Sequence, residues 1–104
     1  MNMTTNGSVT IWHWDEETEE YTPIVFYAAH IYNETRTDAS DGGFVGDNTC
    51  KVRIPTIYPI NVTTDDYIYI GVARGSISKS ECLKVVAFCD NRESTSPHWR
   101  IDAV

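Results

Sequence analysis

The feature that most constrains the fold of this chain is the alternation of residues in Tyr67–Ala73. Ile68, Ile70 and Val72 occupy every second position there. Because successive side chains of a strand point to opposite faces, this period of two predicts a strand with one buried face. The only helical signal is the Ser three residues before a Glu in Ser78–Leu83, which predicts a single helical turn. A fold built from strands is therefore expected.

Five other segments have the β-branched and aromatic content that is typical of strands. They are Ser8–Trp14, Tyr21–Tyr32, Thr49–Ile54, Val85–Cys89 and His98–Val104. The acidic run Asp15–Glu20 is expected to be the turn of a first hairpin, and Arg92–Pro97 the turn of a closing one. We therefore predict an all-β fold, a small β-barrel or sandwich of about six mostly antiparallel strands with one long loop and at most one short helix.

The whole chain, residues 1–104, is expected to form one domain, because its length lies in the usual range for a single core. Residues 1–7 are predicted to be flexible. Residues 33–48 are polar and rich in Gly, which predicts a long loop. Loops of more than about 12 to 15 residues are uncommon unless they bind something, so function is first sought there, with a simple insertion as the alternative. The predicted core comprises Ile11, Val52, Ile54, Ile68, Ile70, Val72 and Ile101.

The charge and the cysteines limit the partners and the compartment. Eight Lys and Arg against fifteen Asp and Glu give a net charge of −7, which disfavours direct binding of nucleic-acid backbones. An acidic surface suits either a protein that stays soluble until it docks or one that lines a channel through which DNA slides without sticking, and charge alone does not choose between the two. No apolar run reaches 18 residues, so no membrane span is expected. Without a basic and apolar leader the chain is expected to stay in the cytosol, where its three cysteines remain thiols, buried or half-buried.

Metal and cofactor sites are not predicted. The zinc-ligand types present are Cys82, Cys89 and His98, with Cys50 or His13 as a fourth, but no two cysteines have the spacing of a zinc knuckle. Asp38, Asp41 and Asp47 do not match a calcium loop. The glycines at 42, 43 and 46 lack the Lys and the helix of a phosphate loop. We therefore expect no metal and no cofactor.

Catalytic residues are not predicted either. A nucleophile needs a base held beside it by a third group. His13, His30 and His98 are the available bases, and none belongs to a recognised nucleophile motif. We therefore expect that the protein is not an enzyme, and keep a hydrolase as the third choice.

An ordered set of segments resembles a family of short proteins encoded in the head-to-tail module of Firmicutes tailed phages and prophages. The segments are Val9–Trp12, Lys51–Pro55, Asp65–Val72, Asp90–Arg92 and Ser96–Trp99. The resemblance implies a small barrel similar to head-closure, or stopper, proteins, which form a ring below the portal and adaptor and help to retain packaged DNA. It implies a location in the virion, after synthesis in the host cytoplasm, and other connector and tail proteins as partners.

The resemblance also implies a homo-oligomeric ring that has passive channel contact with DNA and no contact with a membrane. The alternative positions within the connector are a tail-completion or tail-terminator protein. The alternative of another class is a small-ligand-binding β-barrel whose cavity would be lined by Trp12, Trp14 and Tyr69. The candidate assembly residues are Asp38, Asp41, Gly42, Gly43, Phe44, Trp12, Trp14, His98 and Trp99.

Overall fold

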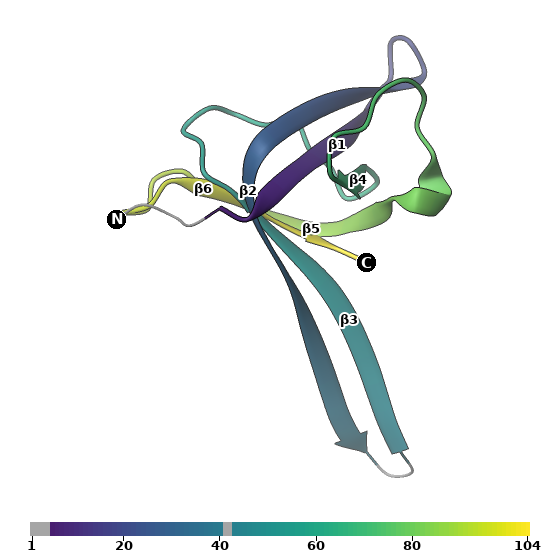
Figure 1. The fold of residues 1–104 in the computed structure, drawn as a ribbon, viewed down its shortest axis with the longest axis vertical. Helices are drawn as coiled ribbons and strands as arrows, with labels where there is room; N and C mark the ends of the chain where they lie inside the picture. The colour runs from purple at the N-terminus through teal and green to yellow at the C-terminus, as the bar shows by residue number, and fades with distance from the viewer. Residues whose placement is uncertain (1–4, 41–42) are drawn as a thin grey trace.

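The computed structural model describes the backbone of residues 5–40 and 43–104 and the side chains of residues 5–33 and 49–104. Six antiparallel strands close into a barrel in the order β1-β2-β3-β6-β5-β4 (Figure 1). The elements are β1 (Gly7–Asp15), β2 (Glu20–Ser40), β3 (Gly43–Ile54), β4 (Tyr67–Ile70), η1 (Lys79–Glu81), β5 (Leu83–Asn91) and β6 (His98–Ala103). The all-β prediction is confirmed, and the barrel alternative is the one that forms.

The strand β2 belongs to both halves of the barrel. It pairs with β1 from Glu20 to Ala29, and with β3 from His30 onwards. The first strand begins one residue earlier than predicted, because Asn6 already bonds across to β2. Its backbone N–H donates to the Ala29 carbonyl (2.9 Å), and its side-chain amide exchanges two 2.8 Å hydrogen bonds with the backbone of Ile31.

The stretch 33–48 is not the predicted loop. The pairing of β2 with β3 continues along it to Ser40 and Gly43, and only residues 41–42 separate the two strands. Since β6 pairs with β3 only over Cys50–Ile54, no third strand is paired with this extension among the described residues. It projects from the barrel as a two-stranded ribbon (Figure 1). The sequence lacks the alternation of a half-buried strand here because the ribbon has no barrel core behind it.

The core lies inside the barrel and consists of the inward-facing residues of alternating runs. Five of the predicted members are at most 1% exposed: Ile11, Val52, Ile54, Ile68 and Ile101. The prediction is wrong for Ile70 and Val72, which are 42% and 39% exposed. The strand β4 ends at Ile70, and the chain then leaves at Gly71 with a φ of 123°, a conformation that favours glycine.

The outer face of β1 is also buried, under the segment that joins β4 to β5. The Thr10 hydroxyl is wholly buried and donates to the Gly71 carbonyl (2.9 Å), while the Ala73 amide donates to the same hydroxyl (2.9 Å). Trp12 faces the same way and is 2% exposed. The helical turn predicted in this segment is the short 3-10 turn η1, and Ser78 makes no side-chain capping bond to it. The segment packs on the barrel instead of forming a longer helix.

Candidate functional site

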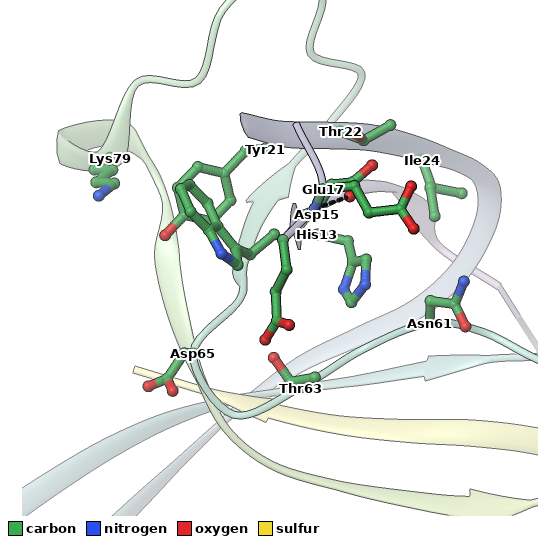
Figure 2. A pocket seen from close by; sticks show the side chains of 12 residues that line it. His13, Asp15, Glu17, Tyr21, Thr22, Ile24, Asn61, Thr63, Asp65 and Lys79 are labelled. Atoms are coloured by element: carbon green, nitrogen blue, oxygen red, sulfur yellow. Dashed lines mark hydrogen bonds between the residues drawn. The ribbon is translucent and has the colours of Figure 1, made fainter. Parts of the chain in front are cut away.

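An open depression of about 1120 Å³ lies beside the turn between β1 and β2 (Figure 2). Its lining includes the acidic residues Asp15, Glu17 and Asp65 together with His13, and the ring of Tyr21 lies at one side. The segment after β3 supplies Asn61 and Thr63 to the opposite wall. The depression is therefore where the β1–β2 turn meets the loop that leads into β4.

A buried carboxylate holds that meeting point together. Asp66 is fully buried, and its Oδ2 lies 2.6 Å from Nδ1 of His13 and accepts the Thr63 amide (2.9 Å). Its Oδ1 accepts the Trp14 amide (3.1 Å). A buried carboxylate with three partners ties β1 to the β3–β4 loop, 52 residues or more apart in sequence. A catalytic triad would need a nucleophile as well, and no Ser, Thr or Cys is hydrogen bonded to His13 in the described part of the chain.

Aromatic rings form a row along the rim of the depression. Trp14 meets Tyr21 edge to face, with ring centroids 5.0 Å apart, and Tyr21 meets Tyr67 in the same way at 5.7 Å. The ammonium group of Lys79 lies over both tyrosine rings, 5.1 and 5.4 Å from their centroids. A cation in this position is attracted to the ring faces, so Lys79 attaches η1 to the rim. Trp14 remains 39% exposed.

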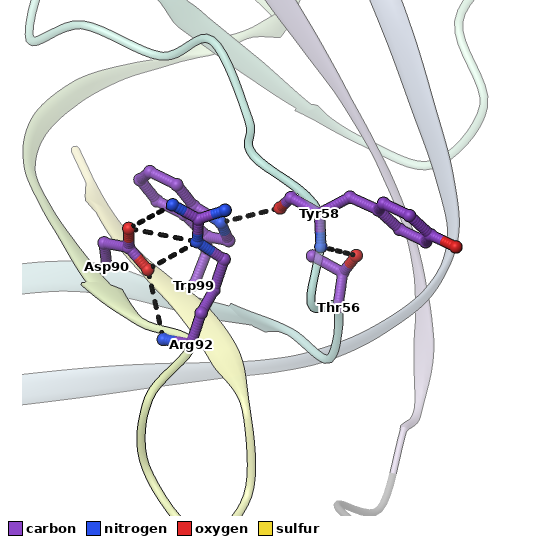
Figure 3. Close-up of polar contacts among 5 residues, drawn as sticks. All are labelled: Thr56, Tyr58, Asp90, Arg92 and Trp99. Carbon is purple, nitrogen blue, oxygen red and sulfur yellow. Dashed lines mark hydrogen bonds and ion pairs between the residues drawn. The ribbon is translucent and has the colours of Figure 1, made fainter.

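A second polar cluster surrounds Trp99, next to the turn that joins β5 to β6 (Figure 3). The indole N–H of Trp99 donates to the Tyr58 carbonyl (3.1 Å), and the guanidinium of Arg92 lies 5.4 Å from the indole centroid. Arg92 binds the Asp90 carboxylate through Nε (2.9 and 3.0 Å) and Nη2 (2.8 Å). The side-chain hydrogen bond from Arg92 lowers the pKa of Asp90 below its ordinary value. Tyr58 itself is 72% exposed.

The structure does not gather the predicted interface residues in one place. Trp12 and Trp99 are buried within the subunit, at 2% and 7% exposure, whereas Trp14 and His98 keep exposed surface on different parts of the barrel. The backbones of Asp38, Gly43 and Phe44 lie in the projecting ribbon. Asp41 and Gly42 lie outside the described residues.

The alternative sites also separate in space. Trp12 and Tyr69 line one small hollow, while Trp14 lines the depression of Figure 2, so the three rings do not surround one ligand cavity. Cys50 is buried, Cys82 is half-buried and Cys89 is exposed, which corrects the expectation that all three thiols are covered. No group of three potential metal ligands occurs among residues whose side chains are described.

A cluster of cations lies on the outer face of β3 and β6, and no pattern in the sequence predicted it. Arg53 lies directly opposite Arg100, and Lys51 opposite Asp102. The members of the two pairs are 47 and 51 positions apart in the sequence, and only the strand register brings them together. The register of the barrel therefore creates a basic surface on an acidic protein.

A protein-family model matches almost the whole chain. The model of a family of unknown function, DUF6751, matches residues 3–104. The chain belongs to this family. The match covers all six strands, from β1 through the ribbon to β6.

No curated protein and no solved structure matches the DUF6751 chain. Within the described residues of this DUF6751 member, no helix is both long and apolar enough to cross a bilayer. Its function must therefore be argued from the surfaces of the barrel.

Proposed function

We propose that this protein is a structural subunit of the head-to-tail connector of a tailed phage, in the stopper position. The observation that supports an assembly role best is the ribbon of β2 and β3, which extends beyond the last residue paired with β6. A two-stranded ribbon is at best marginally stable in water on its own. Its free strand edges are suited to pairing with a neighbouring chain, which would stabilise it.

The particular position in the connector rests on the sequence resemblance described above. A net charge of −7 is compatible with a channel wall that does not hold DNA by its phosphates. Tail-completion and tail-terminator subunits remain the alternatives in the same class, because they too are small proteins that use sheets at ring interfaces.

A ligand-binding barrel is the alternative of another class. It is disfavoured because the described interior is filled by side chains such as Ile11, Val52 and Ile101, each wholly buried. A barrel of few strands has room for a ligand only if its core is incomplete. A screen of small molecules for thermal stabilisation tests this alternative, and a saturable stabilisation would favour it over the connector.

The first test is electron microscopy of particles from a phage or prophage that lacks this gene. The proposal expects DNA-leaking or empty heads beside free tails, and restoration of virions by the wild-type gene in trans. Intact tailed virions without the gene would overturn an essential connector role.

A second test shortens the ribbon. Replacing residues 37–46 by an Asn-Gly turn closes the hairpin on the paired residues Arg36 and Asp47, so the strand register of the barrel is kept. The shortened protein is expected to melt within a few degrees of wild type and to fail to restore virions. The matched control is E93K, in the exposed β5–β6 turn, which is expected to restore them. Normal virion yield with the shortened ribbon would contradict the role given to it.

A further inference from the structure

The basic surface is the outward face of β3 and β6, and its centre is a pair of arginines. Arg53 and Arg100 are direct cross-strand neighbours. Together with Lys51 and Asp102 they make three cations and one carboxylate, although the whole chain is strongly acidic. Like charges directly opposite each other on a sheet are destabilising. An anion beside the two guanidinium groups would reduce their repulsion.

The described side chains satisfy this pair only in part. Arg53 donates from Nη2 to the Tyr32 hydroxyl (3.2 Å), and its guanidinium lies 5.4 Å from that ring's centroid. Asp102 lies 3.7 Å from Nε of Arg100 but also 3.5 Å from Nζ of Lys51. The Nε atoms of both arginines and Oδ1 of Asp102 are buried without a hydrogen-bond partner. These Nε atoms are enclosed within the subunit, so a further carboxylate would be met by the accessible part of the Arg100 side chain, which is 43% exposed.

The same protein carries a surplus of carboxylates at the β1–β2 turn. Five of the six residues from Asp15 to Glu20 are acidic, and Glu16, Glu17, Glu19 and Glu20 are exposed. The turn is ordered locally, since the Asp15 carboxylate accepts the Glu17 amide (2.9 Å). No ion pair from the four exposed glutamates to a Lys or Arg occurs among the described side chains. We call residues 15–20 the acidic tip.

We propose that the acidic tip of one copy docks on the basic face of β3 and β6 of the next copy. The occupant is identified as a second copy by charge complementarity, and this choice rests on the assembly role proposed above. The two surfaces lie far apart on the subunit. The acidic tip ends at Glu20, and Arg53 of the basic face is the cross-strand partner of His30, ten residues further along β2, which is about 33 Å of strand. The two surfaces are different parts of the subunit, so the contact is heterologous and joins copies head to tail.

A phosphate backbone is the competing occupant of the basic face. It is disfavoured because one of the four charged groups there is itself a carboxylate and because the chain's net charge of −7 repels DNA at long range. The acidic tip meets the same Asp102 and the same net charge, but it brings only five carboxylates, whereas duplex DNA carries one phosphate for about every 1.7 Å of its axis and is repelled more strongly.

The test is the concentration dependence of amide NMR spectra of the full-length ¹⁵N-labelled chain, up to about 1 mM at low ionic strength, where even weak association is visible. We expect shifts of two separate groups of amides, those of the acidic tip and those flanking Arg53 and Arg100, and their loss as salt is raised. No concentration-dependent shift in either group would overturn the proposal. Shifts around Arg53 and Arg100 caused only by added duplex DNA would overturn it in favour of nucleic acid.

Charge reversal supplies the specific evidence. E17K and R100E are each expected to weaken association about fivefold or more, because each replaces an attraction by a repulsion. The double variant E17K/R100E reverses one charge on each surface and is expected to recover part of the lost affinity if these two residues face each other. The matched controls E93K and R74E make the same changes in net charge at exposed positions outside both surfaces.

Equal effects of the controls, or a double variant no better than the weaker single one, would overturn the pairing. Folding of each variant is checked by the dispersion of the same spectra. The two proposals can fail separately. If the charge-reversal results contradict the contact while deletion of the gene still gives defective virions, the contact is refuted and the connector role is not. If deletion of the gene gives normal virions, the connector role itself is refuted.

Discussion

The substitution Asp66→Ala tests whether the buried carboxylate is the main link between β1 and the β3–β4 loop. It leaves two part-buried backbone amides, those of Trp14 and Thr63, without their acceptor, and it removes the partner of His13. A fully buried donor left unsatisfied costs about 1–3 kcal/mol, and a part-buried one costs less because water reaches it. The expected loss in the free energy of unfolding is therefore about 2 to 4 kcal/mol, a large part of the roughly 5–15 kcal/mol that holds a domain of this size.

The assay is urea unfolding followed by tryptophan fluorescence at neutral pH, with the slope against urea compared between variants. The neighbouring Asp65 provides a matched control. Its side chain is 88% exposed, and its ion pair with Lys84 is 3.8 Å long, so Asp65→Ala is expected to change stability by no more than about 0.5 kcal/mol.

Asp66→Asn keeps the shape of the side chain but supplies only one acceptor oxygen, and an intermediate loss is expected for it. This variant keeps the test informative if Asp66→Ala does not fold. A loss below about 1 kcal/mol for Asp66→Ala, or equal losses at Asp66 and Asp65, would refute the assignment of the link to this carboxylate.

Three further predictions follow from burial and charge. Ile68→Ala is expected to cost about 2–5 kcal/mol, and Ile70→Asp less than about 1 kcal/mol, because the first side chain is wholly buried and the second is 42% exposed; similar losses in urea unfolding would contradict the β4 register. With a thiol reagent at pH 8, Cys89 is expected to react first and Cys50 last, since Cys89 is exposed and burial raises the pKa of Cys50; mass spectrometry of the labelled peptides checks the order. The lowered pKa of Asp90 means that its ion pair stabilises the fold above the ordinary carboxyl pKa and is lost as the pH falls through the lowered value, so Asp90→Asn should show a flatter acid dependence of stability than wild type.

The barrel itself could be predicted because its strands carry a local signal. Ile11, Val52 and Ile68 alternate with outward-facing residues, and that period survives wherever one face of a strand meets the core. The signal misled at Ile70, since alternation does not say at which residue a strand leaves the barrel. It was absent for the β2–β3 ribbon, where no core lies behind the strands.

The site features depended on information that a single sequence does not carry. Nothing in the pair Asp65-Asp66 indicates which carboxylate is buried, because the partner of Asp66 is His13, 53 residues away. The basic face was equally invisible, since Arg53 and Arg100 become neighbours only through the register of β3 and β6. The acidic tip, by contrast, is contiguous in the sequence and was recognised as an exposed turn.

The shared strand β2 has a mechanical consequence. One uninterrupted backbone runs from the acidic tip at Glu20, along the barrel wall, into the ribbon, and the pairing passes from β1 to β3 between Ala29 and His30. A pull on the ribbon is therefore carried along covalent bonds to the opposite end of the subunit. If the ribbon changes its angle to the barrel, β2 must bend at His30 or beyond, because Ala29 is buried in the core. Force on the ribbon is therefore transmitted through β2 to the barrel wall.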